Sequence, residues 1–211
     1  MPDAVAPLAA FTLANLAPFM SGGVVPTNAS PHHLLMEVGI DDVHGSIKHV
    51  LSRVQRSLYL SMFGFDDDEL AATLWALIQR TDVLVMITLD KSQSGGAHEK
   101  KLLDMERAND LAGFNSHVVI GQSETHQILH TKGFVADGIV GCHGSTNWST
   151  SGEGTFVNAT GPGGVGFKAQ SNTHDWFVDG ASIHTLQTTI ITQHQIAAKQ
   201  SAAIAIKGND A

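Results

Sequence analysis

The sequence predicts an α/β fold, in which a mixed β-sheet is flanked by helices on both faces. Two short apolar runs, at residues 58–65 and 83–89, have the length and composition of buried strands. Between them, apolar residues recur with helical spacing at Leu70, Leu74 and Leu77. Strands that alternate with helices in this way form sheets that are covered on both faces. We therefore expect one central sheet between two layers of helices.

The other elements follow from the same kinds of pattern. Residues 47–54 have helical spacing, and Asp66 followed by Glu69 resembles a capping box at the start of the next helix. A further helix of about ten residues is expected from His98. The elements expected after it are a short strand at 118–120, a hairpin at 134–142, a glycine-rich loop at 152–168, a strand at 175–178 and a helix at 183–190.

Length and composition indicate one main domain. With 211 residues, of which 43% are hydrophobic, the chain can form a sizeable core. We expect an N-terminal extension at residues 1–42, a main domain at 43–203 and a tail at 204–211. The single cysteine, Cys142, excludes an intramolecular disulfide framework and favours a reducing, cytoplasmic compartment. No apolar run is long enough to span a membrane.

The Asp-Gly pair at residues 137–138 predicts a tight hairpin, because Asp-Gly between two apolar runs is typical of a two-residue type I′ turn. In such a hairpin Lys132 faces His143, and His130 faces Ser145. Residues that face each other, or lie two apart on one strand, share a face of the sheet. The polar cluster expected at the open end of the hairpin comprises His130, Lys132, Ser145 and Asn147.

This cluster has the groups that bind an oxyanion such as a phosphodiester. Lys132 supplies a positive charge, while Ser145 and Asn147 supply neutral hydrogen-bond donors. His130 can act as a nucleophile or a proton carrier, because the ordinary pKa of an imidazole is about 6.5. Neither a thiol nor a metal is needed for this chemistry, so we expect no cofactor and no metal. The alternative is a polar hairpin end with a chance histidine.

The spacing His-x-Lys-x4-Asp-x6-Gly-Ser-x-Asn, from His130 to Asn147, is similar to the signature motif of the phospholipase D superfamily. The resemblance extends over residues 43–200. It implies that His130 attacks phosphorus and forms a phosphohistidine that water hydrolyses, while Lys132, Ser145 and Asn147 hold the other oxygens. The chain has one copy of the motif, and small single-motif members pair two chains about a two-fold axis, so a homodimer is implied.

The resemblance also implies a carboxylate that orients the nucleophile. Family members usually carry a Glu near the start of the last strand, but residues 170–175 contain none. Glu153 is the first candidate and Asp175 its rival, and the alternative for Glu153 is a solvated loop carboxylate. Asp137 belongs to the motif, where a turn-forming, structural role is expected. The candidate catalytic set is therefore His130, Lys132, Ser145, Asn147, Asp137 and Glu153.

The substrate is less well specified. The short single-motif architecture most resembles bacterial nucleases of the superfamily, so hydrolysis of DNA or RNA is the leading expectation. A phospholipase or phosphatidyl transferase is the runner-up, and a non-catalytic phosphate-binding module is the third possibility. The formal net charge of −8 excludes a protein coated in basic surface, although Lys91, Lys100 and Lys101 leave room for a local basic groove.

Two further groups have simpler structural explanations. The three aspartates at residues 66–68 lie at an expected helix start, where carboxylates cap the backbone and interact favourably with the helix dipole. His126 and His130 are four residues apart, but they lack a helical register and an obvious third ligand, so zinc is not indicated. His143 is expected to be a polar strand residue beside Lys132.

Overall fold

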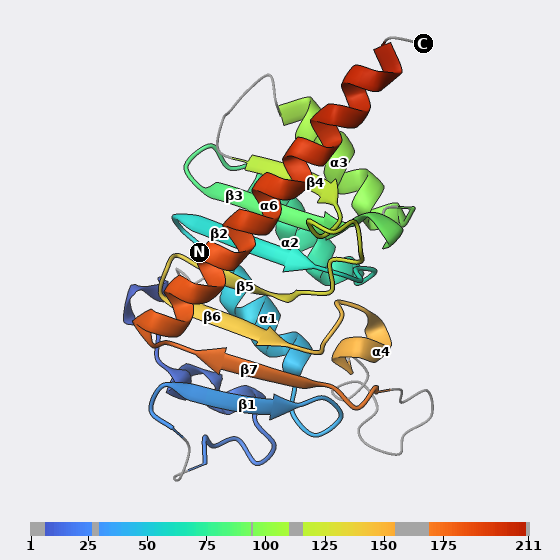
Figure 1. Ribbon diagram of the computed structural model, residues 1–211. Helices are drawn as coiled ribbons and strands as arrows, with labels where there is room; N and C mark the ends of the chain where they lie inside the picture. Colours follow the sequence, from blue (N-terminus) through green and yellow to red (C-terminus); the bar gives the residue numbers. More distant parts are fainter. Residues whose placement is uncertain (1–6, 27–29, 94, 110–115, 155–168, 210–211) are drawn as a thin grey trace.

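The computed structural model of the chain describes residues 7–26, 30–93, 95–109, 116–154 and 169–209. A seven-stranded sheet forms its centre, in the order β1-β7-β6-β5-β2-β3-β4 (Figure 1). The strands are β1 (His33–Glu37), β2 (Ser57–Met62), β3 (Leu84–Asp90), β4 (Ser116–Gly121), β5 (Lys132–Ala136), β6 (Val140–Gly144) and β7 (Thr173–Phe177). Neighbours among β2, β3 and β4 are parallel and the other pairs are antiparallel, which confirms the mixed sheet.

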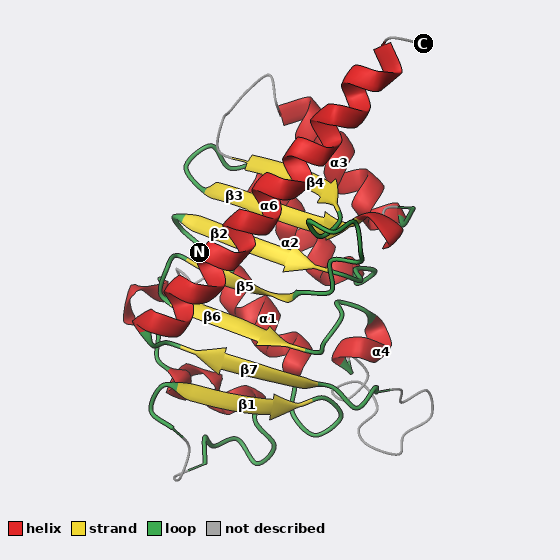
Figure 2. Ribbon diagram, viewed as in Figure 1, coloured by secondary structure: helices red, strands yellow, loops and turns green. Residues whose placement is uncertain are grey.

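Helices cover both faces of this sheet (Figure 2). Helix α6 runs diagonally across one face, while α1 and α2 lie against the other, with α3 beside α2. The helical segments are η1 (Leu8–Ala10), η2 (Leu13–Phe19), α1 (Val43–Leu51), α2 (Asp68–Ile78), η3 (Lys91–Gln93), α3 (Ala97–Asn109), α4 (Thr150–Glu153) and α6 (Gly180–Asn209). In the described part of the chain, no helix combines the length and the apolar character needed to cross a membrane.

The main core lies between the sheet and the layer formed by α1 and α2. The fully buried rings of Phe134 and Trp176 meet edge to face, with their centroids 5.7 Å apart. Helix α1 contributes Ile47 to this core, and Leu74 comes from α2. Helix α2 begins as the sequence suggested, although Asp67 is the capping residue whose carboxylate accepts a hydrogen bond from the backbone of α2.

Helices and strands extend beyond both expected domain boundaries. Strand β1 pairs with β7, and Leu8 and Leu16 are fully buried, so part of the expected extension at residues 1–42 belongs to the domain. At the other end, the backbone of α6 continues to Asn209 through most of the expected tail at 204–211. Pairing between strands so far apart along the chain cannot be inferred from local sequence pattern. Most of the glycine-rich loop, residues 155–168, lies outside the described residues.

Candidate active site

The β5–β6 hairpin is present, but its register differs by one residue from the prediction. Gly133 pairs with His143, where the sequence predicted Lys132. The loop contains residues 137–139, and the first two have left-handed backbone angles, with φ of 54° and 68°, as a type I′ turn requires. Ile139 is a third loop residue, so strand pairing begins again at Val140, which pairs with Ala136. Local sequence does not reveal an extra loop residue of this kind, and it changes which side chains face each other.

Ser145 does not pair with His130. It forms hydrogen bonds with residues at the start of the neighbouring strand, β7. Its hydroxyl donates to Oδ1 of Asn172 across 3.1 Å and accepts from the backbone N–H of Thr173 across 3.0 Å. The predicted pairing of His130 with Ser145 is therefore wrong, because β6 ends at Gly144 and the chain then turns along the start of β7. Ser145 holds that turn in place.

Lys132 and His130 lie together at the open end of the hairpin. The side chain of Lys132 is 4% exposed, and its Nζ donates to the backbone carbonyl of His130 across 3.0 Å. The same Nζ lies 4.9 Å from the ring centroid of Phe63. The exposed imidazole of His130 meets Phe63 edge to face, with ring centroids 4.7 Å apart. Phe63, which follows β2, therefore supports both groups.

Asp90 is a second supporting residue that the sequence analysis did not identify. It is fully buried at the end of β3 and accepts hydrogen bonds from the backbone N–H groups of Leu129 and Ser92. Burial lowers the pKa of Lys132, and the negative charge of Asp90 acts in the opposite direction. Asp90 thus fixes the backbone that leads to His130 and partly balances the buried ammonium. The sequence feature that could have identified Asp90 is its position directly after the apolar run at residues 83–89.

A cleft of about 470 Å³ lies beside Phe63. Gly64, Asn147 and Ser149 are among its lining residues. Gly64 allows Asn147 to approach closely, because an added Cβ there would lie 3.2 Å from Cγ of Asn147. The amide Oδ1 of Asn147 is buried and has no hydrogen-bond partner among the described residues. The structure therefore places Asn147 in the lining of the same cleft as Phe63, the ring that contacts His130.

Asp137 lies at the closed end of the hairpin, across the length of β5 from His130. Its carboxylate accepts hydrogen bonds from the backbone N–H groups of Gln55, Arg56 and Ser57, at 3.0, 2.8 and 2.9 Å. These bonds attach the hairpin to the connection between α1 and β2. The structure therefore does not bring Asp137 into the cluster around Lys132.

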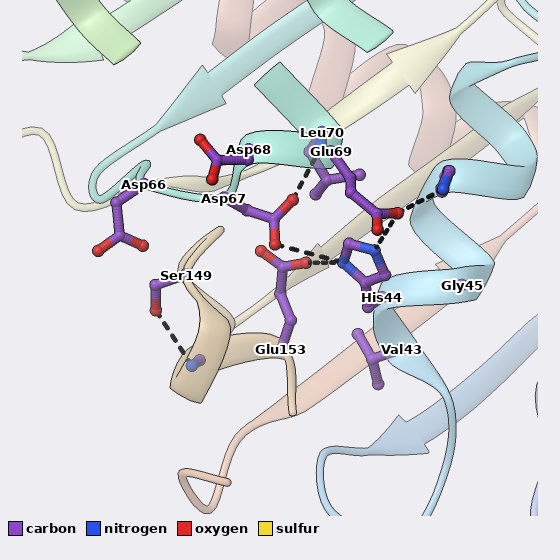
Figure 3. Close-up of polar contacts among 12 residues, drawn as sticks. Val43, His44, Gly45, Asp66, Asp67, Asp68, Glu69, Leu70, Ser149 and Glu153 are labelled. Atoms are coloured by element: carbon purple, nitrogen blue, oxygen red, sulfur yellow. Dashed lines mark hydrogen bonds and ion pairs between the residues drawn. The ribbon is translucent and has the colours of Figure 1, made fainter. Parts of the chain in front are cut away.

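Glu153 likewise has a partner other than His130. It is fully buried in α4, and its Oε2 lies 2.7 Å from Nδ1 of His44, in the first turn of α1 (Figure 3). The rival carboxylate, Asp175, contacts His33 across 3.1 Å. The structure thus does not bring either expected orienting carboxylate to His130. No local motif contains His44, and the sequence analysis did not identify it.

The surroundings of His44 are strongly charged. Its Nδ1 lies 3.6 Å from the carboxylate of Asp67, in addition to the contact with Glu153. Burial lowers the pKa of His44, but the hydrogen bond to Glu153 and the charges of Glu153 and Asp67 outweigh it and raise the pKa to about 9. Burial raises the pKa of Glu153 to about 8, despite the opposing effect of His44. This group is a buried polar centre separate from Lys132.

A third histidine, His174, occupies the beginning of the last strand, where the family pattern has a Glu. It pairs with Gly144 at the end of β6 and packs against Trp176, with ring centroids 5.0 Å apart. Burial lowers the pKa of His174 to about 3, and both ring nitrogens lack a hydrogen-bond partner among the described residues. His174 is therefore neutral in the folded protein. His143 is exposed on β6.

Comparison with known protein families identifies one family model that matches this chain. The sequence model of the family described as "Cardiolipin synthase, PLD-like domain" matches residues 47–156, more than half of the chain. No curated protein matches the chain.

Several solved structures share the fold. The structure of NucT from Helicobacter pylori has a TM-score of 0.59 and 14% identity, and the match covers 76% of this chain and 94% of that one. Nuc from Salmonella typhimurium, described as a phospholipase D family member, has a TM-score of 0.55 and 11% identity, covering 76% and 93%. Phosphatidylserine synthase from Haemophilus influenzae has a TM-score of 0.53 and 10% identity, covering 84% of this chain but 46% of that one. With the matched family model and the motif from His130 to Asn147, these comparisons show that the chain belongs to the phospholipase D superfamily.

Proposed function

We propose that the protein hydrolyses phosphodiesters in nucleic acid, with His130 as the nucleophile and Lys132 and Asn147 as phosphate ligands. The observation that carries this proposal is that the buried ammonium of Lys132 and the exposed imidazole of His130 lie against the same ring, that of Phe63. A positive charge in a poorly solvated position interacts strongly with an anionic group that comes close to it. The adjoining cleft supplies space, and Asn147 in its lining carries an amide NH2 group that can donate to a phosphate oxygen.

The proposed reaction has two displacements. First, a ring nitrogen of His130 attacks phosphorus, the N–P bond forms, and the P–O bond to the leaving group breaks as a proton donor protonates that oxygen. Water then attacks the phosphohistidine, the N–P bond breaks, and a phosphate monoester leaves with the imidazole restored. Lys132 and Asn147 stabilise the charge on the non-bridging oxygens in both steps. This sequence of steps needs no metal ion.

We favour nucleic acid over phospholipid as the substrate because of which solved structures the chain matches over most of their length. Its match covers nearly all of NucT and Nuc but less than half of phosphatidylserine synthase. The single motif also resembles the short bacterial nucleases of the superfamily. The lining of the cleft beside Phe63 includes the hydroxyls of Ser92 and Ser149 and the amides of Gln93 and Asn147, which can donate to phosphates, as well as the carboxylate of Asp66. A phospholipid substrate remains the second candidate.

The test is to incubate the purified full-length chain in excess EDTA with plasmid DNA, single-stranded RNA or phosphatidylcholine vesicles. We expect nucleic-acid cleavage and acid-labile phosphate on the protein after a rapid quench. His130→Ala should abolish both signals, whereas His184→Gln, at an exposed position of α6, is the matched control.

Each alternative gives a different result. Turnover of phosphatidylcholine alone would support the phospholipase, and binding without turnover would support the non-catalytic module. If EDTA abolished activity in a protein that remained folded, and Mg²⁺ or Zn²⁺ restored it, the metal-free mechanism would be wrong.

A further inference from the structure

Three buried side chains from three separate elements converge at one point (Figure 3). His44 lies at the start of α1, Asp67 caps α2, and Glu153 ends α4. Their exposed fractions are 7%, 5% and 0%. One possible ligand atom from each residue lies within 4.8 Å of those from the other two. We propose that these three residues bind a divalent transition-metal ion of the Zn²⁺ type.

The spacing of the donor atoms suits such an ion. Nδ1 of His44 lies 2.7 Å from Oε2 of Glu153 and 3.6 Å from Oδ2 of Asp67. In a tetrahedral zinc site with bonds of about 2.1 Å, neighbouring ligand atoms are about 3.4 Å apart. Imidazole nitrogens and carboxylate oxygens are both ligand types that this class of metal accepts. The site therefore needs only small side-chain adjustments to receive the ion.

A second observation indicates that a ligand is missing from this group. Oε1 of Glu153 is buried and has no hydrogen-bond partner among the described residues. Asp67 uses one oxygen to accept from the backbone of Leu70, at 2.8 Å, which leaves the other directed towards His44. Two neighbouring buried carboxylates repel each other unless they are neutralised. A divalent cation would neutralise both and would give the unpaired oxygen of Glu153 a partner.

The far side of the imidazole is also arranged as in metal sites. Nε2 of His44 lies 3.4 Å from Oε2 of Glu69, and Glu69 is in turn paired with Lys48. Histidines that bind metals usually donate their other ring N–H to a carboxylate, which fixes the tautomer and the orientation of the ring. Glu69 would hold the proton on Nε2, and the proton on Nδ1 would be released to solvent as the ion binds.

The position of the site indicates what the ion would do. Helix α4 follows Asn147 and Trp148, and the carbonyl of Trp148 accepts from the backbone N–H groups of Asp66 and Asp67. A bound ion would therefore tie α1, α2 and α4 together behind the segment that carries Asn147. Its role would be structural, and it is independent of the proposed reaction at His130, which uses no metal.

The experiment uses the full chain, stripped of metal with a chelator that is then removed. Zn²⁺ titrated into the wild type should bind at one site per chain by calorimetry and raise the Tm by several degrees, whereas Mg²⁺ should not. Co²⁺ in place of Zn²⁺ should give visible absorption bands of a low-symmetry site. The variants Asp67→Asn and Glu153→Gln keep the side-chain shapes and should each weaken Zn²⁺ binding about tenfold or more.

The matched control is His33→Gln. His33 also contacts two carboxylates, Asp175 and Asp179, each across 3.1 Å, but its side chain is 42% exposed. This variant should bind Zn²⁺ as the wild type does. Circular dichroism shows whether each variant is folded. If a variant does not fold, the Co²⁺ spectrum of the wild type tests whether the protein binds a metal ion. Absence of Zn²⁺ binding to the wild type, or binding unchanged by Asp67→Asn and Glu153→Gln, would leave an ion pair only and overturn the proposal.

Discussion

The ammonium of Lys132 donates a hydrogen bond to the backbone carbonyl of His130 across 3.0 Å, which fixes the buried charge to the backbone of the residue proposed as the nucleophile. Replacing this side chain separates its electrostatic role from its packing. Lys132→Met keeps most of the volume and removes the charge. We expect kcat to fall by about 10²–10³, because the charge on the phosphate oxygens loses its cation in the transition state.

The same variant should not be much less stable than the wild type. Removing a charge that is 4% exposed relieves its desolvation, so the free energy of unfolding should stay within about 1 kcal/mol or rise. Steady-state kinetics and urea unfolding measure the two effects. An activity within tenfold of the wild type would show that Lys132 is not a phosphate ligand.

Asp137→Ala should lower stability without lowering activity, in contrast to Lys132→Met. Asp137 is attached to the backbone of residues 55–57 and lies far along the hairpin from His130. We expect a loss of about 1–3 kcal/mol in unfolding free energy, because three N–H groups lose their acceptor. The value of kcat/KM for the folded fraction should not change. Asp137→Asn is the control, because Asn retains one acceptor oxygen and tolerates the left-handed backbone at φ 54°. Loss of activity without loss of stability would place Asp137 in the reaction.

Because His174 is buried, we expect the free energy of unfolding to decrease as the pH falls below 6.5. The pKa of His174 is lowered by burial from an ordinary value of 6.5 to about 3 in the folded protein. The unfolded chain therefore binds a proton below pH 6.5 that the folded chain does not bind until about pH 3. The stabilising contribution of neutral His174 is complete above pH 6.5 and is lost as the pH falls, by about 1.4 kcal/mol for each pH unit.

The measurement is the unfolding free energy of wild type and His174→Leu at several values between pH 7.5 and pH 4.5, taken as a difference so that other titrating groups cancel. Leucine suits a buried position whose ring nitrogens have no partner among the described residues. The wild type should lose stability relative to the variant as the pH falls. Parallel pH curves would show that His174 titrates normally in the folded state.

The sequence predicted features that depend on neighbouring residues. The apolar runs at 58–65 and 83–89 contain nearly all of β2 and of β3, and the Asp-Gly pair lies in the hairpin turn. The register was wrong because Ile139 belongs to the loop, and a turn motif does not state where pairing resumes. That single residue decides whether Ser145 faces His130.

Features formed by distant segments could not be predicted from local pattern. His44 and Glu153 are 109 residues apart and meet only because α1 and α4 approach each other in the folded chain. Strand β1 pairs with β7 across a similarly long separation. The sequence analysis named Glu153 as the first candidate for the carboxylate that orients His130, but no spacing in the sequence indicates that it contacts His44.

The last prediction concerns the second proton carrier of the proposed reaction. The two displacements need a nucleophile and a separate group that protonates the leaving oxygen, on opposite sides of phosphorus. The chain has one copy of the motif, and its His130 is exposed at the open end of the hairpin, where a second copy can approach. We therefore expect an active homodimer in which a two-fold axis brings two His130 side chains to one site.

Mixing experiments measure this requirement directly. If each site needs both histidines, equal amounts of wild type and His130→Ala, exchanged to equilibrium, should retain about one quarter of the activity of the same total amount of wild type. Mixed His130→Ala and Lys132→Ala chains should not restore a full site, and activity should fall on dilution below the dissociation constant of the dimer. Light scattering at the assay concentration gives the oligomeric state. A fully active monomer would exclude the shared site and would require another acid, for which His126 and His143 are the first to replace.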